Sequence, residues 1–291
     1  MSEVNSNKPV KLKNRSCPYC AVALSPENST VEHVISRKFV PKGFLENQWN
    51  IILNACEACN QRKADLEDDL SALTMHPEIT GWRGDEHQQL REDAARKAKG
   101  SFSRKTGKPI GQSKEQLNMK LAGNGFTMSF GLISGPQIDE LRAYDLAVMQ
   151  AQAVLYWLTY SDRTQVGARW ANNNKILRVG SARQSDWGCD RMKAFMVFTR
   201  DWDHYFTHET AKGCYRISLR GGPDRSLWSF AVEWNRSYRV VFLVGDEQQL
   251  TTALQSLPNP KSRHIQGFDG KTALKVRQEK SLDDLDDSMF T

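Results

Sequence analysis

The sequence has no long apolar run. Its most apolar stretch, residues 146–158, is shorter than the ~20 residues that a transmembrane helix needs, and it contains Gln150 and Gln152. The first 16 residues are polar and lack the apolar segment of a secretory signal. These absences predict a cytoplasmic protein with no membrane partner.

Cysteine is scarce, but four of the six cysteines are spaced as two pairs. Cys17 and Cys20 form one C-x-x-C pair, and Cys56 and Cys59 form the second. A reducing compartment disfavours disulfides, so the pairing favours a metal. Each pair can direct two thiolates at one ion, and four sulfurs complete the tetrahedral site of a structural Zn²⁺.

Acidic residues are outnumbered, and the excess of basic ones is unevenly distributed. The net charge of the 291-residue chain is +6, and residues 96–120 hold eight lysine or arginine residues and one acidic residue. Basic segments attract polyphosphate backbones, although a solvated linker is the alternative interpretation. The last dozen residues hold four aspartates and are expected to form a disordered tail.

The residues between the two cysteine pairs predict a strand, a second strand and a helix. Residues 30–35 are rich in β-branched side chains, and residues 51–53 form another short apolar run. Residues 61–73 contain no glycine or proline and place leucines at helical spacing.

The second half of the chain predicts an α+β unit with one long helix against a mostly antiparallel sheet. Residues 136–160 form the strongest helical pattern. Four apolar or β-branched runs bounded by turn residues indicate strands, at 192–199, 214–219, 227–234 and 238–244. We therefore divide the chain into residues 1–80, a polar basic connector at 81–124, and an α+β domain at 125–291 whose role the sequence does not indicate.

The two cysteine pairs, the Glu32-His33 dipeptide, Asn50 and the segment from Asn60 to Lys63 together resemble the zinc-containing branch of the HNH nucleases. That family shares a ββα-metal fold. The resemblance covers residues 15–75, about a quarter of the chain. It implies that residues 1–80 form a ββα-metal domain with a structural zinc ion.

The resemblance also implies roles for individual residues. His33 matches the general base, while Glu32 and Asn60 match the ligands of one catalytic Mg²⁺ or Mn²⁺. Asn50 matches a structural amide behind the histidine. Nucleic-acid contacts are expected from four basic residues: Arg37, Lys38, Arg62 and Lys63. Neighbours on a regular strand point to opposite faces, so we expect a bend or bulge where Glu32 and His33 serve one phosphate.

These features predict a metal-dependent endonuclease that hydrolyses phosphodiester bonds, with DNA as the expected substrate. A zinc-stabilised nucleic-acid-binding or adaptor protein without catalysis is the alternative. A phage-defence or mobile-element effector is a further interpretation, based on family-level association alone. The sequence leaves open whether the C-terminal domain binds a second copy or another protein.

Overall fold

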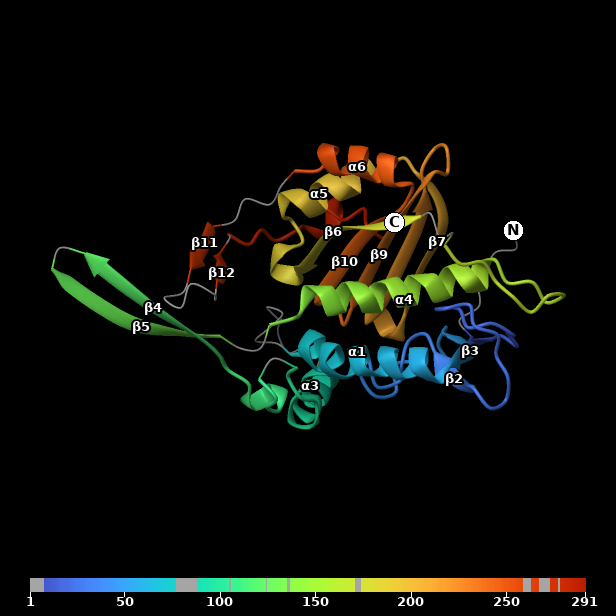
Figure 1. The fold of residues 1–291 in the computed structure, drawn as a ribbon, viewed down its shortest axis with the longest axis horizontal. Coiled ribbons are helices and arrows are strands. Elements are labelled where there is room, and N and C mark those ends of the chain that lie inside the picture. The colour runs from blue at the N-terminus through green and yellow to red at the C-terminus, as the bar shows by residue number, and fades with distance from the viewer. Residues whose placement is uncertain are drawn as a thin grey trace.

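The computed structural model is an α+β protein with mixed and antiparallel sheets (Figure 1). It describes the following residues: 8–76, 88–104, 106–123, 125–134, 137–170, 174–258, 263–266, 273–276 and 278–291. In this part of the chain, no helix is both long and apolar enough to cross a lipid bilayer.

The N-terminal unit is a small sheet with a helix packed on it. Its strands are β1 (Val10–Lys11), β2 (Ser29–His33) and β3 (Ile51–Cys56), and the helix α1 (Glu57–Met75) follows directly. In the order β1-β3-β2, the central strand β3 is parallel to β1 and antiparallel to β2. The order strand, strand, helix agrees with the pattern of the sequence.

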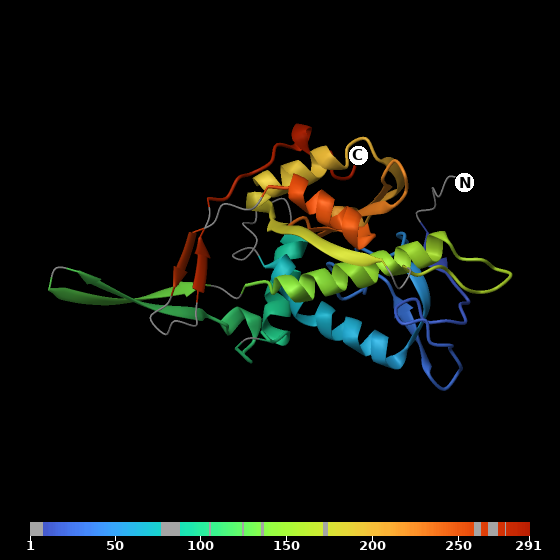
Figure 2. The same cartoon turned by 45° about the horizontal axis from the view of Figure 1, so that its top comes forward.

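The predicted connector contains regular structure. Residues 81–87 lie outside the described residues, but helix α3 (Gln88–Gly100) packs against α1 through Leu90, Ala94 and Ala98. Strands β4 (Glu115–Gly123) and β5 (Phe126–Ser134) form a two-stranded arm that extends away from the body of the molecule (Figures 1 and 2).

The C-terminal half is built around a five-stranded antiparallel sheet in the order β6-β10-β9-β8-β7. Helix α4 (Glu140–Leu158) covers one face, while α5 (Asp190–Phe198) and α6 (Glu247–Ser256) cover the other (Figure 1). The strands are β6 (Lys175–Arg183), β7 (Asp203–Thr210), β8 (Tyr215–Gly221), β9 (Leu227–Trp234) and β10 (Tyr238–Gly245).

Shorter elements complete the description. A second two-stranded sheet pairs β11 (Arg263–Gln266) with β12 (Ala273–Val276). Single turns of 3₁₀-helix are η2 (Ile110–Gln112), η3 (Gln184–Asp186), η4 (Ala211–Gly213) and η5 (Asp284–Asp286).

One of the four predicted strands is a helix. Residues 192–199 lie mostly in α5, where Met192, Phe195 and Met196 share a buried face. Their spacing of three and four residues is helical, and it matters more than the β-strand preference of Val197 and Phe198. The prediction of a strand here is therefore wrong.

The N-terminal unit and the C-terminal sheet share one hydrophobic core. Ile35 and Ile51 belong to the same buried cluster as Leu146 of α4 and Phe230 of β9. Helix α4 lies between α1 and the sheet (Figures 1 and 2). Two buried hydrogen bonds also join the halves, from Thr210 Oγ1 to the Trp49 carbonyl at 2.8 Å and from Asn235 Nδ2 to the Phe39 carbonyl at 3.1 Å.

The acidic tail, expected to be disordered, is held against the sheet. The buried guanidinium of Arg239 pairs with Glu233 of β9 at 2.7 Å and with Asp287 of the tail. Arg220 donates 2.6 Å and 3.0 Å hydrogen bonds to the backbone oxygens of Ser288 and Thr291. The aspartate is ordered because it neutralises a buried cation, a contact that local composition does not reveal.

Candidate functional site

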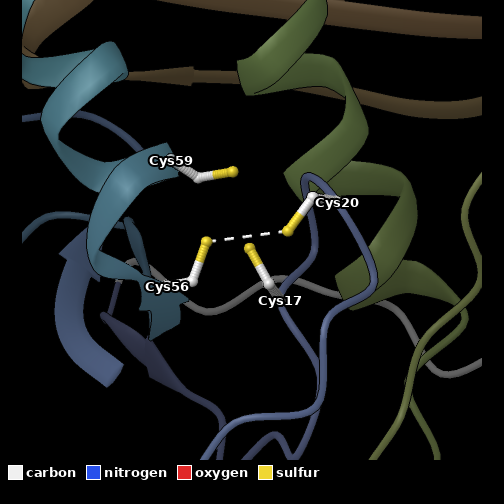
Figure 3. Close-up of side chains that lie close together, drawn as sticks. All are labelled: Cys17, Cys20, Cys56 and Cys59. Carbon is white, nitrogen blue, oxygen red and sulfur yellow. Dashed lines mark hydrogen bonds between the residues drawn. The ribbon is translucent and has the colours of Figure 1, made fainter. Parts of the chain in front are cut away.

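Four cysteine side chains converge where β3 meets α1 (Figure 3). All four Sγ atoms lie within 4.8 Å of one another, and those of Cys20 and Cys56 are 3.6 Å apart. In a tetrahedral site with Zn–S bonds of about 2.3 Å, the sulfurs lie about 3.8 Å apart. Cys17, Cys20, Cys56 and Cys59 can therefore hold a metal ion such as zinc.

The two cysteine pairs come from segments that are distant in the sequence. Cys17 and Cys20 lie in a turn that is closed by a 2.9 Å bond from the Cys17 amide to the Val22 carbonyl. Cys56 is the last residue of β3, and Cys59 lies in the first turn of α1. A bound metal would fasten the N-terminal turn to the start of the helix.

The protonation of the thiols links metal binding to pH. Burial raises the pKa of Cys17 and, more strongly, that of Cys59. Without a metal, these two sulfurs are therefore protonated near pH 7. Because zinc binds thiolates, its binding displaces those protons, and its affinity increases with pH.

Glu32 is 5% exposed and forms an ion pair inside the N-terminal unit. Its Oε1 is 2.7 Å from the Nζ of Lys63, which is also 2.6 Å from Glu67 Oε1 and donates to the His33 carbonyl. The Tyr19 hydroxyl donates a 3.3 Å hydrogen bond to Glu32. For Glu32 to bind a metal, its carboxylate must share or release the ammonium of Lys63.

In this buried cluster two carboxylates share one ammonium. Burial lowers the pKa of Lys63, but Glu67 and Glu32 raise it by more, so the ammonium stays charged. Burial raises the pKa of Glu67, and Lys63 opposes that shift. When both carboxylates are ionised, two negative charges face one positive charge. An additional cation beside Glu32 would be favoured by this excess.

Asn60 lies on the helix face that packs against β2. Its Nδ2 donates a 2.7 Å hydrogen bond to Thr30 Oγ1, two residues before Glu32 on the same strand. This bond fixes the orientation of the amide. The Oδ1 atom forms no hydrogen bond with any residue that the structure describes, so it remains available as an oxygen ligand.

His33 is half-buried at the end of β2. Burial lowers its pKa, the positive charge of Arg37 lowers it further, and Glu32 opposes the shift. The imidazole is therefore neutral at pH 7 and can accept a proton. The pairing of β2 with β3 continues through Glu32 and His33 without a register shift, so the expected bulge is not there.

Asn50 forms hydrogen bonds with the backbone of Ile35, two residues after His33. It is 4% exposed, its Oδ1 accepts the Ile35 amide at 3.1 Å, and its Nδ2 donates to the Ile35 carbonyl at 2.8 Å. Both polar groups of the side chain are therefore used within the protein. The two bonds hold the backbone of Ile35 in place.

The four basic residues predicted to contact nucleic acid lie in different environments. Arg37 and Lys38 are exposed on the segment that follows β2. Arg62 is exposed and pairs with Asp145 of α4 at 2.8 Å. Lys63 is 1% exposed. Arg37, Lys38 and Arg62 are therefore at the surface. Lys63 is not, because its ammonium forms ion pairs inside the N-terminal unit, so the prediction that it contacts nucleic acid does not fit its position.

Sequence reasoning missed Tyr19, Thr30 and Glu67, the partners of the predicted site residues. Glu67 follows Lys63 by four residues, a spacing that pairs opposite charges on one helix face. That signal was available in the sequence. The hydrogen bonds that join Tyr19 to Glu32 and Asn60 to Thr30 span 13 and 30 residues, so no local sequence pattern indicates them.

Comparisons with protein-family models, with curated proteins and with solved structures find no match for this chain.

Proposed function

We propose that the chain is a metal-dependent HNH-type endonuclease that hydrolyses phosphodiester bonds in DNA. The observation that carries the proposal is the hydrogen bond between Asn60 and Thr30. It packs the start of α1 against the strand that holds Glu32 and His33. The cysteine cluster lies at the same end of α1, where a structural zinc would stiffen this arrangement.

In the proposed reaction, His33 accepts a proton from the attacking water. A half-buried imidazole with a lowered pKa is neutral and therefore basic at physiological pH. Asn50 keeps the backbone after His33 in place through both of its hydrogen bonds to Ile35. Since β2 has no bulge, the phosphate would lie at the end of the strand, where His33 is its last residue.

Glu32 and Asn60 would hold the catalytic Mg²⁺ or Mn²⁺ through one carboxylate and one amide oxygen. When bound, such an ion stabilises negative charge on the phosphoryl and leaving oxygens. The free Oδ1 of Asn60 suits this role, and so does the sharing of one ammonium between Glu32 and Glu67. The product would carry a 5′ phosphate, as the resemblance to the family implies.

The ion pair between Glu32 and Lys63 favours a second candidate function. If Lys63 holds the carboxylate permanently, the ammonium takes the place of the cation. The chain would then be a zinc-stabilised protein that binds nucleic acid or acts as an adaptor without cutting. Exposed cations such as Arg37 and Lys38 would serve either function.

Nicking of supercoiled plasmid DNA separates the two candidates. We expect the purified protein to nick plasmid with added Mg²⁺ or Mn²⁺ and to be inactive in EDTA. Loss of an outer-shell partner alone costs about 10–100-fold in metal sites. Asn60→Ala should therefore slow nicking by at least about tenfold, while Gln61→Ala, a change at the exposed neighbouring residue, should not. Binding without nicking in every metal would favour the adaptor.

A further inference from the structure

A large cavity lies beside the candidate site, between the segment that follows β2 and the helices α1 and α3. Its volume is about 980 Å³. Residues 36–47 form one wall, α1 contributes Ala64, Glu67, Asp68 and Ser71, and α3 contributes Arg96 and Lys97. This volume is within the usual range for small-molecule sites and too small for a nucleic-acid duplex.

The cavity is lined by more positive charge than its own carboxylates neutralise. Its cations are Arg37, Lys38, Lys42, Arg96 and Lys97, and its acidic residues are Glu46, Glu67 and Asp68. Arg96 pairs with Asp93, but two of the carboxylates are engaged by cations outside the lining, Glu67 by Lys63 and Asp68 by Arg104. The other four cations form no ion pair within the described part of the chain.

Lys97 is the most informative of these cations. Its Nζ is 2.6 Å from the hydroxyl of Ser71, a neutral partner. Burial lowers its pKa to about 8, although the carboxylate of Asp68 opposes the shift. A half-buried ammonium without an opposite charge in contact is costly. An anion in the cavity would remove that cost.

The remaining lining suits a phosphate ester with an organic group attached. Leu45 adds apolar surface on the wall opposite α1 and α3. Lysine ammonium groups bind phosphate as point charges. The hydroxyls of Ser71 and Ser101 donate to Asp68, at 3.0 Å to its carbonyl and 3.1 Å to its carboxylate, so the lysines are the main donors to a bound phosphate. The surroundings of Lys97 therefore match a nucleotide better than a simple inorganic ion, which would leave most of the cavity empty.

We propose that this cavity binds the phosphate of a nucleotide-sized phosphate ester, with Lys97 on one wall and Lys42 on the other as its main charged contacts. The ester is either a free mononucleotide or one nucleotide of a single strand. The proposal does not rest on the cleavage reaction, because neither lysine belongs to the candidate catalytic set.

Two probes distinguish a free mononucleotide from a nucleotide of a single strand as the ligand. Adenosine 5′-monophosphate is titrated by calorimetry, with adenosine as the phosphate-free comparison, and a fluorescein-labelled single strand of about ten nucleotides is followed by anisotropy. We expect at least one of the two phosphate-bearing probes to bind. If the free nucleotide is the ligand, adenosine should bind at least about tenfold more weakly than the monophosphate. Binding of the strand alone would identify the strand as the source.

Variants at Lys97 and Lys42 test the contacts. Lys97→Met and Lys42→Ala should each lower the affinity for the probe by at least about tenfold, which is the effect of losing one charged contact to phosphate. Lys99→Met, on the same helix but exposed and outside the cavity lining, should bind like the parent. Because Lys97 lacks a charged partner, its replacement should not lower the melting temperature. Equal binding by Lys97→Met and Lys99→Met, or no binding of either probe to the parent, would overturn the proposal.

Discussion

Replacing His33 with alanine is expected to slow metal-dependent plasmid nicking by about 10²–10⁴-fold, the usual contribution of a general base. In the proposed reaction this imidazole is the base; it is half-buried at the end of β2, and no described residue forms a hydrogen bond with its ring. Its loss should leave the fold intact. The measurement is the initial rate of nicking at saturating Mg²⁺.

The control for this variant is His204→Ala, which removes an exposed histidine of β7 far along the chain. The parent should also lose activity as the pH falls. Since burial and Arg37 lower the pKa of His33, the midpoint of the decline should lie below the ordinary histidine pKa of about 6.5. Nicking by His33→Ala at the parental rate, with the same acid limb, would remove His33 from the reaction.

Replacing Cys17 with serine is expected to abolish stable zinc binding and to destabilise the N-terminal unit by several kcal/mol. Structural zinc sites in small domains contribute apparent binding free energies of about 10–16 kcal/mol near pH 7, and this energy stabilises the fold. Cys17 is fully buried and belongs to the same core as α4, so the loss should spread beyond the turn. Zinc content and the thermal melt are the two measurements.

Cys189→Ser is the matched variant, because it removes another buried thiol that lies outside the cluster. Its zinc content should equal that of the parent. A Cys17→Ser protein that keeps stoichiometric zinc and the parental melting temperature would contradict the structural role of the cluster. Chelation of the parent should reproduce the effect of Cys17→Ser.

Local sequence signals predicted the elements that depend on neighbours in the chain. The two C-x-x-C pairs come together as a cluster, and residues 61–73 lie within α1. The predicted strands at 227–234 and 238–244 are β9 and β10, which pair with each other as antiparallel neighbours. In each case the side chains involved are close in sequence or repeat at a fixed spacing.

Residues 115–123 show where the sequence interpretation was too coarse. Because this segment carries Gln116, Asn118 and Lys120, we assigned it to a polar connector. Those residues alternate with Leu117, Met119 and Leu121, which is the period of a strand, and the structure has β4 there. The overall polarity concealed the alternation.

Two other features that the sequence did not predict result from ion pairs between residues far apart in the chain. The sequence places Lys63 on the predicted helix, but nothing near it shows that its ammonium meets Glu32, which lies 31 residues earlier. In the same way, Asp287 is ordered by Arg239, which is 48 positions away. Such contacts depend on the completed core, so the composition of a segment does not predict them.

The central claim is that a divalent cation binds between Glu32 and Asn60. Diffraction from crystals soaked in Mn²⁺, with anomalous data, tests it most directly. We predict an Mn²⁺ peak within coordination distance of Asn60 Oδ1 and the Glu32 carboxylate, with the Lys63 ammonium shifted from its present position 2.7 Å from Glu32. An empty position beside Asn60, with Lys63 still paired to Glu32, would contradict the account.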